Sequence, residues 1–220
     1  MSQSRRSGSV VGMSAPLGAS ARKVAIEAAP GVVLSGDLQL PRGGSSRGVV
    51  LLPGGLGPSR VTPGNGRTAQ VFNDAGIATL RLGLLTAVEE GYLADMFDVE
   101  LLAQRLLAAT RWLARRPETA SLAPGYFGTS GSAAIVLRAA AESRASVCAV
   151  LSRGDALAVE PERAGAGLPH VLLITARAEA EVLTLAARWF GEHLGDRGSP
   201  RRRRWRAGTS PAAVLPLSPR

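Results

Sequence analysis

The chain has 220 residues, enough for one domain of ordinary size with a sizeable core, and carries a formal charge of +9. A single cysteine excludes an internal disulfide, and one cysteine with two histidines argues against a zinc cluster. No apolar stretch approaches the ~20 residues that a membrane span needs. We therefore expect a cytoplasmic protein with no membrane segment, metal or organic cofactor.

The positive charge is concentrated at the two ends of the chain. Residues 1–22 carry three arginines and residues 197–220 carry seven, with no acidic residue in either segment, whereas residues 23–196 have a net charge of −1. The first segment is also rich in Ser, Gly and Ala without periodicity, which is typical of disorder. We predict a disordered leader at 1–22, one domain at 23–196 and a basic disordered tail at 197–220.

Apolar runs bounded by glycine and proline alternate with amphipathic stretches. The predicted strands are 23–28, 32–40, 48–52, 77–82, the run that ends at Ser130, 147–152 and 171–175. The predicted helices are 65–75, 98–116, 131–142 and a last one ending near Leu194. The first two strands flank Pro30-Gly31 and so predict an antiparallel hairpin. The remaining order predicts an α/β fold with a doubly wound, mostly parallel sheet.

Sheets of this kind place their chemistry at the carboxyl ends of the strands. Four features of the sequence follow predicted strands directly: the loop 53–60, Ser130, Asp155 and Glu179. Asp155 is a candidate pocket residue. These features are therefore expected to lie along one edge of the sheet.

Ser130 stands in the sequence Gly128-Thr129-Ser130-Gly131-Ser132, between a strand-like run and an alanine-rich helical run. A nucleophile elbow needs small residues two positions before and two after the serine, because strand and helix approach closely there. The usual pattern is G-x-S-x-G, and Ser132 replaces the last glycine. The alternative is a glycine-rich turn whose serine is merely hydrogen-bonded.

Six segments of the chain stand in a recognisable order: VVLLPGGLGPSR, VFNDAGIATLRLGLLT, FDVELLAQRLLAATRWL, GYFGTSGSAA, AVLSRGD and ARWFGEHL. Together they resemble the dienelactone-hydrolase-like branch of the α/β-hydrolases, which includes hydrolase-like domains sometimes found with phosphoribosyltransferases. The resemblance runs from residue 23 to residue 194. It implies an α/β-hydrolase-type sheet and a serine hydrolase acting on a small ester, lactone or related acyl compound.

The resemblance also implies roles for individual residues. Ser130 would be the nucleophile, and the Gly131 amide would donate one hydrogen bond to the oxyanion. A second oxyanion donor would come from the backbone near Gly55 and Leu56. The catalytic acid would be Glu179, since it lies nearest to the family's acid position. Alternatively, Glu179 is a solvated acid in the first turn of a helix, where the dipole favours it.

The catalytic histidine is the main departure from the family. The fold carries it on a loop after a further strand and before the last helix. In this chain the acid position leads almost directly into the last helix, so we predict that the last strand and the histidine loop are missing. His170 and His193 are the two histidines, and their places in the sequence favour structural or surface roles. We therefore expect an impaired site.

Three functions remain open. The first is a serine hydrolase with an impaired site, and the second is a non-catalytic protein of the same fold that binds a small molecule or partner. The third assigns the function to Arg201–Arg206, whose arginines flank Trp205 and could contact nucleic acid or an acidic protein. An unstructured end explains that segment more simply, so we expect no nucleic-acid partner. Self-association into a homodimer stays open.

Overall fold

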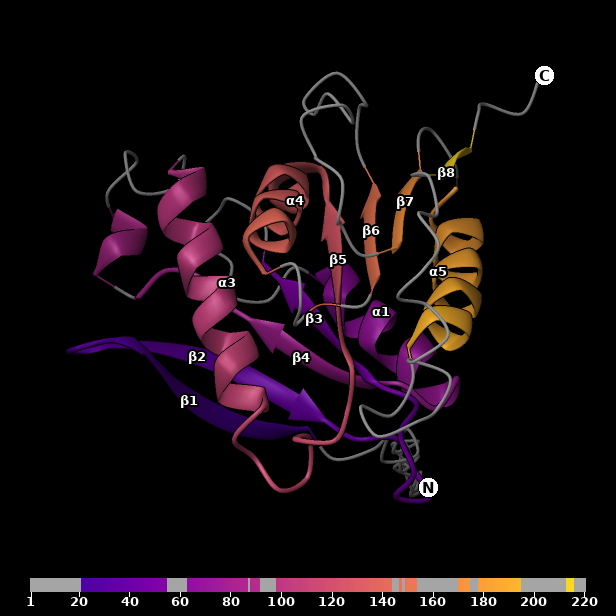
Figure 1. Cartoon of the computed structure of the whole chain (residues 1–220), viewed down its shortest axis with the longest axis horizontal. Helices are drawn as coiled ribbons and strands as arrows, with labels where there is room; N and C mark the ends of the chain where they lie inside the picture. The colour runs from indigo at the N-terminus through magenta and orange to yellow at the C-terminus, as the bar shows by residue number, and fades with distance from the viewer. Residues whose placement is uncertain are drawn as a thin grey trace, which may run out of the picture.

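The computed structural model describes residues 21–54, 63–86, 88–91, 98–143, 147, 149–153, 170–174, 178–194 and 213–215. These residues form one eight-stranded sheet with the strand order β1-β2-β4-β3-β5-β6-β7-β8 (Figure 1). β1 pairs with β2, and β2 with β4, in antiparallel fashion, and all other neighbours are parallel. The predicted doubly wound, mostly parallel sheet is confirmed.

The elements follow the predicted order, with small shifts at their ends. The strands are β1 (Arg22–Ala29), β2 (Val32–Gln39), β3 (Val49–Pro53), β4 (Ala78–Leu82), β5 (Pro124–Thr129), β6 (Ala149–Arg153), β7 (His170–Ile174) and β8 (Ala213–Leu215). The helices are α1 (Pro63–Asp74), α3 (Val99–Leu113), α4 (Ala133–Glu142) and α5 (Glu179–His193), with the short 3-10 turns η1 (Glu89–Gly91) and η2 (Ser130–Ser132).

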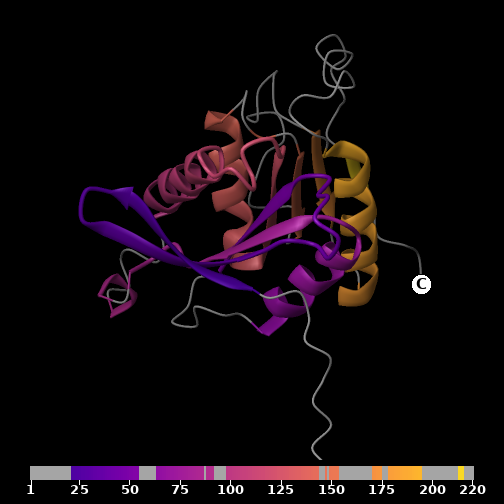
Figure 2. The ribbon, with the colours of Figure 1, turned by 90° about the horizontal axis from the view of Figure 1, so that it is seen from below.

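Helices cover both faces of the sheet, with α3 and α4 on one side and α1 and α5 on the other (Figure 2). Successive residues of β3 point to opposite faces, so Val49 and Leu51 pack in the α3/α4 layer while Val50 and Leu52 pack in the α1/α5 layer. Burial on both faces is why the central strands read as continuous apolar runs.

α5 runs back across the sheet, antiparallel to the parallel strands. Its Phe190 ring lies 5.5 Å from that of Phe72 in α1, edge to face. Leu194, just after the helix, packs against Gly48 at the amino end of β3, where a Cβ atom on the glycine would lie 2.7 Å from the Leu194 Cβ. α5 therefore begins at the carboxyl edge of the strands and ends at their amino edge.

The structure corrects the prediction for the end of the chain. We expected residues 197–220 to be a disordered tail, yet Ala213–Leu215 forms β8 and pairs in parallel with β7. The outer edge of β7 offers unpaired backbone groups, which the apolar segment can satisfy. β8 follows α5, so it is not the strand that was predicted to be missing before the last helix. Only residues 175–178 join β7 to α5, too few to hold a strand and a histidine loop.

The boundary of the predicted leader also shifts, because Arg22 begins β1 and forms an ion pair with Glu118.

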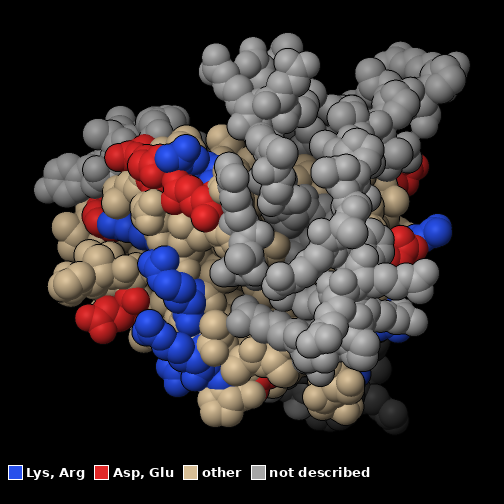
Figure 3. Space-filling view, in the orientation of Figure 1, with Lys and Arg blue, Asp and Glu red and all other residues tan. Residues whose placement is uncertain are grey.

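On the face drawn in Figure 3, basic and acidic side chains lie close to one another, consistent with the near-neutral balance of residues 23–196. One such group joins α3 to α4, where Arg138 pairs with Glu100 and Glu142. Within the described ranges, no helix is long and apolar enough to cross a membrane.

Candidate functional site: a strand-to-helix elbow at the carboxyl edge

The carboxyl ends of the parallel strands form one edge of the sheet. Thr129 of β5 pairs in register with Arg153 of β6, which pairs with Ile174 of β7. Ser130 follows β5 directly, and Glu179 begins α5 shortly after β7. β5 and β7 are separated by one strand, so their ends lie about 10 Å apart. The fold thus brings the predicted nucleophile and acid positions to the same edge.

Gly128 lies at the closest approach of β5 to α4. A Cβ atom at this position would lie 2.5 Å from the Val136 Cγ2 and 3.0 Å from the backbone oxygen of Ser132. Such distances leave no room for a side chain, and both neighbours are fully buried residues, one in α4 and one its N-cap. The small residue that an elbow requires two positions before its serine is therefore needed here for steric reasons.

Ser132 occupies the position of the last glycine in the pattern and is completely buried. Its hydroxyl accepts a hydrogen bond from the Thr129 N–H at 3.1 Å and lies 3.1 Å from the Thr129 carbonyl oxygen, to which it can donate. Ser130 and Gly131 therefore sit in a turn whose two ends are joined by a side chain.

The other residues predicted for the site are placed as follows. Gly131 is exposed in η2, next to Ser130. Glu179 is exposed in the first turn of α5, together with Glu181, and the N-cap residue of this helix is Ala178, which offers no side-chain acceptor. Acids in this turn are favoured by the helix dipole. Gly55, Leu56 and Asp155 lie outside the described residues.

Both histidines of the chain lie at the opposite edge of the sheet. His170 is the first residue of β7 and pairs with Ala149, the first residue of β6, so its Cα is about 13 Å along the strand from Ile174. His193 ends α5, about 21 Å along the helix from Glu179. Its ring stacks on Trp189 at 3.7 Å, and its Nδ1 lies 2.8 Å from the Trp189 carbonyl oxygen.

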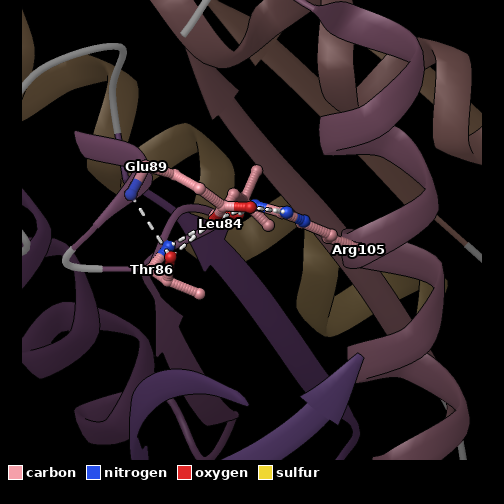
Figure 4. A network of polar contacts seen from close by, with 4 residues as sticks. All are labelled: Leu84, Thr86, Glu89 and Arg105. Carbon is pink, nitrogen blue, oxygen red and sulfur yellow. Dashed lines mark hydrogen bonds and ion pairs between the residues drawn. The ribbon is translucent and has the colours of Figure 1, made fainter. Parts of the chain in front are cut away.

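A polar network stands at the same edge as the elbow, after β4 (Figure 4). Arg105, buried in α3, donates to the Leu84 carbonyl at 2.8 Å and forms a two-pronged ion pair with Glu89 of η1. Glu89 also accepts from the Thr86 N–H and hydroxyl, each at 2.8 Å. The network ties the segment that follows β4 to α3.

Hydrogen bonds from Arg105 and Thr86 lower the pKa of Glu89 to about 2, although partial burial opposes them. A carboxylate with that pKa is a very weak base at neutral pH, so Glu89 is a poor replacement for the histidine. The sequence interpretation missed this network. Thr86-Ala87-Val88-Glu89 has the T-x-x-E spacing of a capping box, and that signal could have revealed it.

Taken together, the strand order, the two helical layers and the elbow after β5 define an α/β-hydrolase fold. Solved structures agree. The chain is 32% identical to dienelactone hydrolase from Anabaena variabilis, with a TM-score of 0.70, covering 80% of this chain and 98% of that one. It is 18% identical to the esterase domain of a Rhodothermus marinus protein, with a TM-score of 0.56, covering 79% and 99%. The second likeness shows the fold alone.

The chain belongs to the dienelactone hydrolase family. A candidate phosphoribosyl transferase of Mycobacterium tuberculosis, found in two strains, is 42% identical over 166 residues, which are 76% of this chain. Those residues are only 37% of the mycobacterial protein, so the activity in its name is not carried over to this chain. No protein-family model matches the chain.

Proposed function

We propose that the chain is a serine hydrolase with an impaired site, in which Ser130 accepts an acyl group from a small ester, lactone or related acyl compound. The observation that carries the proposal is the elbow, with Gly128 at the closest contact of β5 and α4 and Ser130 directly after the strand. The kinship with a dienelactone hydrolase supports the substrate class.

In the proposed reaction, the Ser130 hydroxyl oxygen bonds to the carbonyl carbon of the substrate. The tetrahedral intermediate collapses as the ester or lactone C–O bond breaks, and the serine proton ends on the leaving oxygen. Water then adds to the acyl carbon, releasing the acid and restoring the hydroxyl. The Gly131 N–H, with backbone donors near Gly55 and Leu56, would stabilise the oxyanion in both steps.

The position of the histidines supports the impairment. Neither His170 nor His193 lies at the edge that carries Ser130, and a general base must come within hydrogen-bond reach of the proton it removes. General-base catalysis typically contributes 10²–10⁴-fold, on the order of the loss expected here. The same observation favours the second candidate function, a non-catalytic protein that uses the pocket of the fold to bind a small molecule.

Active-site labelling separates the two functions. We expect a fluorophosphonate probe to modify Ser130 slowly in the wild type and not at all in Ser130→Ala, as measured by intact-protein mass spectrometry. His170→Ala and His193→Ala should be labelled at the wild-type rate. A folded wild type that is neither labelled nor able to hydrolyse p-nitrophenyl acetate above background would favour the binding protein. Loss of labelling in a folded histidine variant would contradict the impaired site.

A further inference from the structure

Ser132 is the position at which this elbow departs from the G-x-S-x-G pattern. We propose that Ser132 is the positioning residue of the elbow: its hydroxyl holds the turn between β5 and α4 and thereby fixes where Ser130 stands. The inference rests on the proposed function, because Ser130 is the nucleophile whose placement is at issue.

The Ser132 hydroxyl is hydrogen-bonded across the turn. It bonds to both backbone groups of Thr129, the residue immediately before Ser130, at 3.1 Å each. The backbone of Ser132 itself leads into α4. Ser130 is thus enclosed between the two residues that the hydroxyl joins. Since Ser132 is fully buried, water does not compete for these bonds. Removing the hydroxyl would therefore take one hydrogen-bond partner away from the Thr129 N–H and one from the Thr129 carbonyl oxygen.

Ser132 does not cap α4 with its side chain. It is the N-cap residue of α4, and a serine at that position ordinarily accepts a hydrogen bond from the first turn of its helix. Here the side chain makes no capping hydrogen bond and turns back to the strand instead. The local preference of the residue type is therefore overridden by the bond to Thr129.

The turn has little space on the side of Gly128. The Ser132 backbone oxygen is one of the atoms that exclude a side chain at Gly128, so strand and helix are already in contact on that side. A glycine at position 132 would keep this close approach but would add backbone freedom and remove the hydroxyl. Serine keeps a small side chain and adds a fixed connection between the two ends of the turn.

The test compares Ser132→Ala and Ser132→Gly with Thr119→Val. Thr119 is also buried, and its hydroxyl donates to the Leu113 carbonyl at 2.7 Å, but it lies before β5 at the other edge of the sheet. We expect the Thr129 amide to exchange its hydrogen about five- to tenfold faster in both Ser132 variants, as expected for a lost hydrogen bond. Ser130 labelling by the fluorophosphonate should slow by about the same factor.

Thr119→Val should lower the midpoint of thermal unfolding yet leave the Thr129 amide exchange and the Ser130 labelling rate unchanged. Wild-type exchange at Thr129 in the Ser132 variants would overturn the inference, as would equal slowing of labelling by Thr119→Val. If wild-type Ser130 takes no label, the proposed function fails, and the amide exchange still decides whether Ser132 holds the turn.

Discussion

Gly128 is the residue whose replacement should perturb the elbow most directly. Gly128→Ala places a methyl group where two neighbouring atoms already stand within 3.0 Å, so we expect a loss of about 1–3 kcal/mol in the free energy of unfolding. Urea denaturation measures this loss. Labelling of Ser130 should slow as well, because α4 can only relieve the contact by moving away from β5.

Gly83→Ala is the matched control, since a Cβ atom there would meet only the Ser35 and Leu85 carbonyl oxygens at 3.7 and 3.9 Å. Its effect should stay within about 0.5 kcal/mol, as for most substitutions away from special features. Equal losses for the two variants would mean that the approach of β5 to α4 does not depend on Gly128.

At the residue scale, sequence reasoning located the elbow because small residues at fixed spacing are a local signal. It also predicted structural or surface roles for His170 and His193, and the structure has both at the edge opposite to Ser130. The hydrogen bonds of Ser132 could not be predicted in this way. They depend on how closely α4 packs on β5, and the local preference of a serine at that position is to cap the helix.

At the scale of elements, the ion pair between Glu89 and Arg105 stabilises the position of η1 against α3. Glu89→Gln leaves the buried guanidinium without its charged partner, so we expect a loss of roughly 2–3 kcal/mol at pH 7. Glu100→Gln is the control, because that carboxylate pairs with Arg138 at the exposed surface and should contribute less than about 1 kcal/mol.

This contribution should depend on pH. The pKa of Glu89 is lowered in the folded state from 4.5 to about 2, so the unfolded chain binds more protons between these values. The stabilisation is present above about pH 4.5 and is lost as the pH falls toward 2. Denaturation curves from pH 7 to pH 2.5 should therefore show the wild type and Glu89→Gln converging. A constant difference would show that the ionised carboxylate is not what stabilises the segment.

The longer elements could be predicted from sequence. Each central strand is a buried apolar run and each helix carries an apolar stripe on one face, and the ends are marked by glycine, proline or an N-cap such as Asp98. Two short elements were missed. η1 is signalled only by the T-x-x-E spacing, and β8 is a three-residue run in a segment that otherwise reads as disordered. β8 pairs with a strand about forty residues away, and local patterns carry no information about such pairing.

For the whole molecule, the informative change is truncation after Leu194. It removes β8 together with seven arginines and one aspartate, which lowers the formal charge from +9 to +3. Because β8 is short and at the edge of the sheet, we expect one cooperative unfolding transition with a loss of no more than about 2 kcal/mol. Binding to a heparin column should weaken strongly, since it depends on clustered arginines.

Two results would contradict this prediction. Loss of the cooperative transition would mean that the domain needs β8 to fold. Unchanged heparin retention would assign the polyanion affinity to the domain surface, where arginines and carboxylates are interspersed.

The position of α5 also bears on how the protein is made. The apolar layer between the sheet and α5 contains Val50 and Leu52 of β3 and Phe72 of α1, all from the first third of the chain, and α5 is translated more than a hundred residues later. Until residue 194 has left the ribosome, that apolar surface stays open to other chains. Nascent chains stopped before α5 should therefore aggregate or bind chaperones, and the step that ends this exposure is the docking of Leu194 against Gly48.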